Sequence, residues 1–502
     1  MILALVSAFA VAGEPPTLLP EAVPRPAEPE TGLRFVGLFD TKLSVNDIGT
    51  ESALVNGQIV GTLGGTNATT LQAAPAGFAE QRALGMFRYT PRLLDGKASL
   101  VAAFEVDFAW GDSSYATGGN TGGGFGGDQV NLQTKRLAAR FRLREGLVGV
   151  VGLQFVGDGA VDPEGAKLDD LLRGGGHLLF FGSEAAGLSL YGRAFDDQLR
   201  YKLGGYTLVE QALAEPDDIT LWMADTRWSP AYATTVGLHG WYLRDRAGGT
   251  GGVIGTGPTS ALSEMQGGPR LDVRDTDTEA QPEVSAALAW IVADAGYNAA
   301  LDKGRFGVAG LGALNLGRLY VTDKKDANVR GLLLDVEGRA RYAPGAGSVV
   351  RVEGLYSTGD TPPQEGGDLT YTGVFTGNTY GIVGANYLTH GCMLLFPDAN
   401  SINRQVAVVY DVSGAGKGVL GLSGQVGYDP LPNKLTVAVG GGIAQDAKGQ
   451  PLGQEVNLRV VGRPLPLLNV GAYGAVATGT ALQRELGVMP WTSYLALNWV
   501  VY

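Results

Sequence analysis

The chain has 502 residues, a formal net charge of −12 at pH 7, 78 glycines and only 18% charged residues. The negative charge argues against nucleic acid as a partner, and the single cysteine, Cys392, excludes both an intrachain disulfide and a cysteine-based metal cluster. No stretch reaches the ~20 continuous apolar residues of a membrane-spanning helix. Composition does not shift after residue 32, so we expect one large domain there instead of several smaller soluble ones.

The chain opens with a short apolar segment, Ile2–Val11, which overlaps the small-x-small pattern Ala10-Val11-Ala12. No Lys or Arg precedes the apolar run, but the rest matches a secretory signal peptide, so residues 1–12 are predicted to be removed. Residues 13–32 follow and contain six prolines. Because so many prolines cannot join hydrogen-bonded ladders or helices, this segment is predicted to be an extended spacer.

A two-residue alternation of apolar and polar side chains then runs from Leu33 to Tyr502. Side chains of a β-strand point alternately to its two faces, so this period predicts strands. In Ser99–Trp110, the apolar side chains alternate with polar ones such as Glu105. In Gln133–Arg144, the apolar set alternates with four arginines. The fold is therefore predicted to be all-β.

Two all-β architectures fit this alternation. A soluble sandwich would bury the apolar set, whereas a transmembrane barrel would place it in lipid and the charged set in a wet lumen. The connections favour the barrel, because short turns alternate with long glycine-rich loops. The predicted long outer loops are Gly111–Asp128, Arg246–Pro282 and Thr358–Gly377, and the short inner turns include Glu145-Gly146 and Asp429–Asn433. Short turns on one rim and long loops on the other are typical of outer-membrane barrels.

The clearest strand candidates cover nearly the whole of residues 33–502, which are predicted to form the barrel domain. They are Leu33–Val45, Arg82–Tyr89, Ser99–Trp110, Gln133–Arg144, Leu147–Phe155, Leu188–Phe195, Gln198–Tyr206, Ile219–Trp228, Thr234–Arg244, Val284–Val292, Arg305–Leu314, Gly331–Tyr342, Val349–Ser357, Arg404–Val412, Val419–Tyr428, Lys434–Ala444, Glu455–Gly462, Leu468–Ala477 and Trp491–Tyr502. Leu54–Thr62 and Thr379–Leu388 are weaker candidates. Since single-chain bacterial barrels have even strand numbers, we expect about 18 antiparallel strands, with 16 or 20 as alternatives.

The carboxyl end resembles the terminal strand that the barrel-assembly machinery recognises. Apolar or aromatic residues alternate at Tyr494, Ala496, Val500 and Tyr502, and Asn498 interrupts the series. Aromatic residues near strand ends suit the two interfacial girdles of such barrels. These girdle candidates are Trp110, Tyr206, Trp228, Tyr242, Tyr342, Tyr356, Tyr428 and Trp499.

The layout of the chain resembles bacterial outer-membrane porins and, more loosely, the alginate-export and porin families. The resemblance rests on Leu153–Gly159 after an Arg-rich strand, on Asp169–Arg173 before the next strand, and on Tyr356–Asp360 at the start of a long loop. It implies a Gram-negative outer-membrane location, with the proline-rich spacer in the periplasm. It also implies contact with outer-membrane lipids, assembly through the strand that ends at Tyr502, and a homotrimer or a monomer. It does not imply a particular solute.

No catalytic constellation stands out, so we expect no enzyme activity and no cofactor. The histidines His177, His239 and His390 lie far apart and lack metal-ligand spacing, so each is expected in the lumen or in a loop. An acidic stretch from Asp272 to Glu279 could offer oxygen ligands to a divalent cation, but a solvated acidic loop is the simpler interpretation. No metal site is predicted.

Charges on the polar strand faces are the candidate functional residues, because they would project into the pore. The basic candidates are Arg136, Arg140, Arg142, Arg144, Arg200, Lys202, Arg339, Arg341 and Arg351, with Arg459 as a further member; the acidic candidates are Glu105, Asp107, Asp335, Glu337 and Glu353. In a pore with low-dielectric walls, such charges concentrate ions of opposite sign. Alternatively, they pair across strands and stabilise the wall.

Two functions therefore remain open. The first is an outer-membrane channel, either a porin or an export conduit, for small hydrophilic and possibly anionic solutes. The second is a barrel without transport that serves as a structural protein or a platform for surface loops. A barrel enzyme is a weaker third candidate. Single-channel conductance separates the first two most directly.

Overall fold

The structure, a computed structural model, describes residues 31–47, 76–110, 132–160, 183–210, 215–247, 284–301, 303–321, 326–360, 370–376, 392–396, 412–413, 417–480, 483–484, 487 and 489–501. The predicted signal peptide and nearly all of the proline-rich spacer lie outside these residues, as do His177, His390 and the acidic stretch Asp272–Glu279. None of the helices in the described residues is long and apolar enough to span a membrane.

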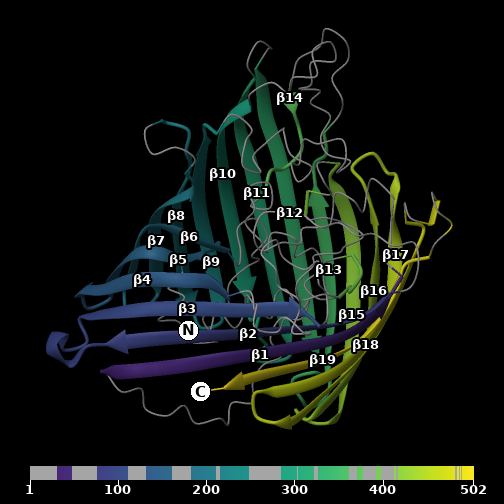
Figure 1. Cartoon of the computed structure of the whole chain (residues 1–502). Helices are drawn as coiled ribbons and strands as arrows, with labels where there is room; N and C mark the ends of the chain where they lie inside the picture. Colours follow the sequence, from purple (N-terminus) through teal and green to yellow (C-terminus); the bar gives the residue numbers. More distant parts are fainter. Residues whose placement is uncertain are drawn as a thin grey trace.

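The described strands form one closed antiparallel barrel (Figure 1). They are β1 (Gly32–Asn46), β2 (Ala76–Thr90), β3 (Ala98–Ala109), β4 (Leu132–Arg144), β5 (Leu147–Val156), β6 (Ser183–Ala194), β7 (Leu199–Val209), β8 (Ile219–Ala231), β9 (Thr234–Asp245), β10 (Val284–Tyr297), β11 (Phe306–Val321), β12 (Ala327–Arg341), β13 (Val349–Ser357), β14 (Thr370–Tyr371), β15 (Val419–Leu431), β16 (Leu435–Gln445), β17 (Pro451–Leu465), β18 (Leu468–Thr478) and β19 (Trp491–Val501). The ring closes because β1 pairs with both β2 and β19. Only β14 lies outside the antiparallel wall, as a two-residue strand parallel to β12.

The wall therefore has 18 of the 19 described strands, as predicted. The predicted strand Arg404–Val412 lies outside the described residues except for Val412, which is buried in a turn, and β13 pairs directly with β15. The weaker candidate Leu54–Thr62 also lies outside the described residues, and β1 pairs directly with β2.

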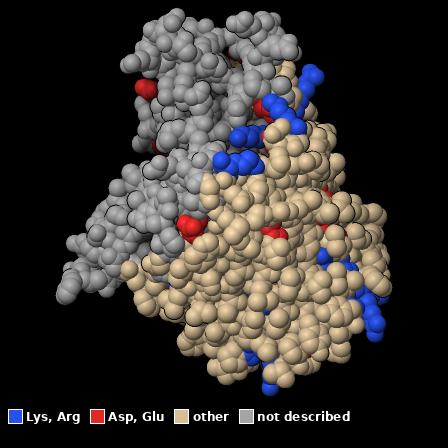
Figure 2. Space-filling model, turned by 90° about the vertical axis from the view of Figure 1, so that its right-hand side faces the viewer, with Lys and Arg blue, Asp and Glu red and all other residues tan. Residues whose placement is uncertain are grey.

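The alternation places apolar side chains on the outside of the barrel. In β1, Phe35 and Leu43 are 43% and 45% exposed, whereas the intervening Asp40 and Lys42 are buried. Outward aromatic rings also pack across strands: the ring centroids of Phe35 and Phe87 are 5.1 Å apart. The described surface in Figure 2 is accordingly a broad uncharged area with few Lys, Arg, Asp or Glu. An apolar exterior on a closed barrel matches a lipid environment, because the sheet has no unpaired edge and its backbone is hydrogen-bonded internally.

The longest connections all lie on one rim, opposite the tightest turns. On one rim, β4 and β5 are joined by residues 145–146, β8 and β9 by 232–233, and β17 and β18 by 466–467. On the other rim, β3 and β4 are joined by residues 110–131, and β9 and β10 by 246–283. The predicted long loops therefore lie on the rim opposite the predicted short turns. We refer to these as the short-turn rim and the long-loop rim.

Not every outward or inward assignment was correct. Tyr206, predicted for a girdle, is 3% exposed and faces the interior from β7, whereas Trp228, Tyr342 and Tyr428 of the predicted girdles are exposed. In β19, the series Tyr494, Ala496 and Val500 is buried inside the barrel, and the lipid-facing set is Leu495, Leu497, Trp499 and Val501. Asn498 is therefore a normal member of the inner face.

The inner face of β8 to β13 departs from the predicted polar lumen, because it is largely apolar. Leu221, Leu243, Leu288 and Trp290 are fully buried there, in one hydrophobic cluster of the barrel interior. The outward positions of the same strands are also apolar, such as Ile291 at 51% exposure. Such strands are apolar on both faces and require an apolar partner inside the barrel.

Two inward segments of the β13–β15 connection supply this partner. Tyr371 at the end of β14 and Phe375 after it lie in the interior, and the indole N–H of Trp290 donates a hydrogen bond to the carbonyl of Phe375 over 2.9 Å. Met393 to Phe396 belong to the same cluster, and Cys392 beside them is buried. The prediction that Thr358–Gly377 faces the outside is therefore wrong for residues 371–376, which fill part of the barrel.

Candidate pore and its charged inner wall

Most of the predicted pore-lining residues that the structure describes lie on the inner face. Six of them are nearly fully buried inside the barrel: Arg136, Arg140, Lys202, Asp335, Glu337 and Glu353. Glu105 is also buried on the inner face, and Arg200, Arg339, Arg341 and Arg351 are partly buried. Arg142 and Arg144 are exposed where β4 reaches the short-turn rim. The side chain of Asp107 lies outside the described residues.

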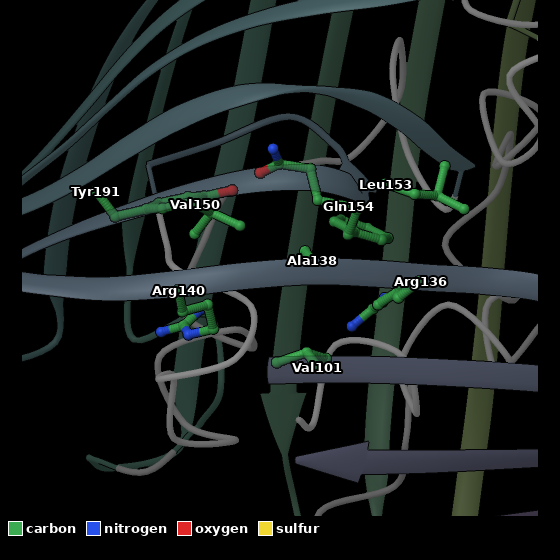
Figure 3. Close-up of a pocket in the computed structure, with 9 residues that line it drawn as sticks. Val101, Arg136, Ala138, Arg140, Val150, Leu153, Gln154 and Tyr191 are labelled. Atoms are coloured by element: carbon green, nitrogen blue, oxygen red, sulfur yellow. The ribbon is translucent and has the colours of Figure 1, made fainter. Parts of the chain in front are cut away.

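Arg136 and Arg140 flank a small pocket on the inner wall. They lie on β4 on either side of Ala138, with Val101 of β3 on one side (Figure 3). Gln154 and Tyr191, from β5 and β6, border the opposite side. The floor is small and apolar, and cationic groups stand at its two ends. Guanidinium groups bind carboxylate or phosphate with paired hydrogen bonds, so the two arginines give this part of the wall the chemistry of an anion contact.

The surroundings of this pocket fix its shape. The guanidinium of Arg136 lies 5.3 Å from the ring centroid of Phe155 and 4.0 Å from a carboxylate oxygen of Glu184. Gln154 donates a hydrogen bond to the carbonyl of Gly187 over 2.9 Å and accepts one from the Ser189 hydroxyl. These contacts hold the Gln154 amide between β5 and β6.

Some predicted charges are paired, as the alternative interpretation required. Glu105 lies 3.4 Å from Arg82 of the neighbouring β2 and 3.1 Å from Lys135 of β4. Arg339 forms two hydrogen bonds with the Glu337 carboxylate, over 2.6 and 2.7 Å, within the same strand. Glu353 accepts a hydrogen bond from Ser423 of β15 over 2.9 Å. These groups stabilise the wall and neutralise one another in part.

A buried network that the sequence did not reveal crosses β7 to β10. Lys202 lies 2.7 Å from one carboxylate oxygen of Asp225, whose other oxygen is 2.8 Å from Nδ1 of His239. Nε2 of His239 is 2.6 Å from Asp294, and Trp241 donates to Asp225 over 2.8 Å. His239 was predicted as a lumen or loop residue, and it lies in the interior. These five residues come from four strands, so only the strand register, which was not predicted, brings them together.

Three polar residues of β17 hold the inward segment at residues 392–396. The Glu455 carboxylate accepts hydrogen bonds from the backbone N–H groups of Leu394, Leu395 and Phe396, over 2.5, 2.8 and 3.1 Å. Asn457 donates to the carbonyl of Cys392 over 2.9 Å, and Arg459 to that of Met393 over 3.3 Å. Arg459 was predicted to face the lumen; here its side chain contacts the segment that fills it.

The closed 18-strand ring, its apolar exterior and its partly charged interior define a transmembrane antiparallel β-barrel. No family model matches the chain, and no curated protein matches it.

Solved structures with the same general layout are similar at low identity. They include Pseudomonas aeruginosa OccK9 (OpdG), with 11% identity, 93% of this chain and 98% of that chain covered, and a TM-score of 0.49. P. aeruginosa OpdK with vanillate has 11% identity, the same coverage of 93% and 98%, and a TM-score of 0.47. Vibrio cholerae OmpT in a trimer form has 10% identity, coverage of 93% and 99%, and a TM-score of 0.39. Function is therefore inferred from the residues of this chain.

Proposed function

We propose that the protein is an outer-membrane channel for small hydrophilic solutes and that its basic inner wall favours anions. The observation that carries the proposal is the pocket between Arg136 and Arg140 on the inner face of β4. Both guanidinium groups lie inside the barrel, at 2% and 5% exposure, where low-dielectric walls strengthen their field. The overall charge of −12 does not oppose this selectivity, because permeation samples only the constriction.

The passage is expected to be eccentric. The interior beside β8 to β13 is occupied by the apolar cluster and by residues 371–376 and 392–396. The inner faces of β1 to β4 carry polar and charged side chains instead, such as Lys42 and Arg140. Solutes would therefore pass along the β1–β4 side and meet the Arg136–Arg140 pocket on the way. At the short-turn end of β4, Arg142 and Arg144 would extend the same field to the rim.

Proteoliposome swelling tests this proposal with gluconate and glucose, which are similar in size and differ in charge. The channel should admit gluconate at least as fast as glucose. Arg136→Gln/Arg140→Gln should lower the gluconate rate relative to glucose, whereas Arg136→Lys/Arg140→Lys, which keeps both charges, should retain most of it. Faster glucose entry in the parent protein would contradict anion preference. Absence of swelling for both solutes, with the barrel folded, would favour the non-transporting structural barrel.

A further inference from the structure

Three arginines interrupt the apolar exterior near the long-loop rim. Arg244 of β9, Arg318 of β11 and Arg330 of β12 are exposed, and each lies next in sequence to a buried, inward-facing residue. Their side chains therefore point away from the lumen and cannot line the pore. We call these three residues the outer basic patch.

Strand register brings the patch together. Arg244 is paired with Ala287 of β10, and Ala287 is paired in turn with Arg318. The two arginines thus lie two strand spacings apart, about 10 Å, with only a methyl side chain between them. Arg330 of β12 is paired with Leu316 of β11. It therefore lies on the strand next to that of Arg318, one outward position further from the long-loop rim. Two long cationic side chains can converge above Ala287, with the third beside them.

The height of the patch matches a membrane interface. One pair further from the long-loop rim, the outward row contains Trp222, Tyr242, Ala289 and Leu316. Trp222 and Tyr242 are 58% and 44% exposed. Such aromatic side chains mark the level of lipid headgroups on membrane barrels, with hydrocarbon beyond them. Arg244 and Arg318 lie one outward position above this row and Arg330 lies within it, at the level where lipid phosphates are found.

The partners of the patch leave its charge largely available. Arg318 lies 3.0 Å from the Asp326 carboxylate, in a pair whose side chains are 55% and 32% exposed, and its guanidinium is 5.8 Å from the Tyr320 ring centroid. Such an exposed ion pair is weak and exchanges readily. Within the part of the chain that the structure describes, Arg244 and Arg330 have no ion pair. Two of the three cations thus lack a fixed counter-charge there.

From this placement we propose that Arg244, Arg318 and Arg330 form a binding site for the phosphorylated headgroup of a membrane lipid in the leaflet on the long-loop side. Guanidinium groups bind phosphate oxygens with charge-assisted, often bidentate, hydrogen bonds. The neighbouring apolar and aromatic side chains accommodate the acyl chains of the same molecule. A lipid satisfies both halves of the surface, whereas a free anion satisfies only the basic half.

Native mass spectrometry of the full-length barrel in a non-ionic detergent tests the site. The probe is bis-phosphorylated lipid A, with phosphatidylcholine as the zwitterionic comparison. Arg244→Gln/Arg318→Gln/Arg330→Gln should weaken lipid A binding about tenfold or more. The matched control Arg92→Gln/Lys97→Gln/Arg305→Gln removes three exposed charges at the short-turn rim and should bind lipid A like the parent protein. Phosphatidylcholine should bind all variants alike.

Several results would overturn the proposal. Equal lipid A binding by the parent and the triple variant would do so, as would an equal loss in the control, which would indicate a general charge effect. Displacement of lipid A by inorganic phosphate at matched phosphate concentration would show a free-anion site. Heat-modifiable gel mobility checks folding of each variant. If the triple variant does not fold, the three single Gln variants replace it in the lipid A binding measurement. An unchanged affinity for lipid A in all three would equally reject the site.

Discussion

The side-chain amide of Asn498 donates a hydrogen bond over 2.6 Å to the carboxylate of Asp40, and this contact joins the last strand of the barrel to the first. Asp40 and Asn498 are direct register partners on the inner faces of β1 and β19. Both are buried, at 4% and 8% exposure. The residue that interrupts the apolar series in the terminal strand therefore has a structural role at the seam where the barrel closes.

Asn498→Ala should destabilise this seam. The substitution leaves the buried Asp40 carboxylate without its amide donor, which costs about 1–3 kcal/mol. Urea unfolding of the barrel, followed by heat-modifiable gel mobility, should show a lower midpoint. Ser493→Ala, on the lipid side of the same strand, is the control and should unfold like the parent. A variant at Asn498 with an unchanged midpoint would indicate that the contact does not contribute to closure.

Lys202→Met should lower the free energy of unfolding far more than Arg193→Met does. Lys202 and Asp225 form a nearly inaccessible ion pair over 2.7 Å, whereas the Arg193–Asp197 pair, over 3.1 Å, is about half exposed. Removing one partner of a buried pair leaves an uncompensated charge and costs about 3–5 kcal/mol. The exposed pair is worth about 1 kcal/mol at most. Free energies of unfolding from urea titrations measure both, and equal losses would contradict the interpretation of the buried network.

Phe104→Arg and Phe141→Arg test which face meets lipid. Phe141 is 43% exposed on the outside of β4. The ring centroid of Phe104 lies 6.4 Å from that of the outward-facing Phe87. An arginine on the lipid face near the membrane middle costs about 2–4 kcal/mol. Leu93→Arg, in the short turn before β3 and 92% exposed, should cost little. Folding titrations into lipid vesicles give the differences, and neutral effects at both phenylalanines would reverse the assigned faces.

Glu455→Gln should release the inward segment and expose Cys392. The Glu455 carboxylate accepts hydrogen bonds from three backbone N–H groups of the segment. A glutamine side chain has only one acceptor oxygen, and its NH₂ group is a donor that cannot accept from an N–H. Since hydrogen bonds to a charged group are worth about 1.5–3 kcal/mol, alkylation of Cys392 should accelerate about tenfold or more. Gln454→Ala, which removes an exposed side chain of the same strand, should react like the parent. Unchanged reactivity at position 455 would show that the carboxylate does not hold the segment.

The pH dependence of the same reaction follows from burial of Cys392. Desolvation raises the pKa of the thiol to about 11. At pH 8 only roughly one thiol in a thousand is then the reactive thiolate. Alkylation of the folded parent should therefore rise about tenfold per pH unit and level off only near that pKa. A plateau near the ordinary cysteine pKa would mean that the thiol is exposed to water.

The alternation of side chains was sufficient to predict the barrel. Successive side chains of a strand point to opposite faces, and the face towards lipid is apolar while the face towards water is polar. The alternation failed where an inner face is apolar, as at Leu221, Leu243 and Trp290. There the chain folds Phe375 and residues 392–396 back into the barrel, and a strand covered on both faces gives no alternation.

The site was predicted only in part for a similar reason. Arg136 and Arg140 could be placed on one face by their even spacing. Their pocket also needs Gln154 and Tyr191, which only the β4–β5–β6 register brings beside them. The Glu455 contacts involve backbone groups 59 to 61 residues away in sequence. Register between strands and the path of a long connection are not encoded in a local pattern.

The central claim, that solutes pass an Arg-lined inner wall, is tested most directly by zero-current potentials of single channels in planar bilayers under a potassium chloride gradient. The parent protein should conduct and prefer chloride, more strongly at low salt, where the charges are less screened. Arg136→Gln/Arg140→Gln should shift the potential towards cation preference, while Arg92→Gln/Lys97→Gln at the short-turn rim should shift it little. A folded, conducting Arg136→Gln/Arg140→Gln variant with the parent's potential would contradict the claim, as would a folded parent protein that does not conduct.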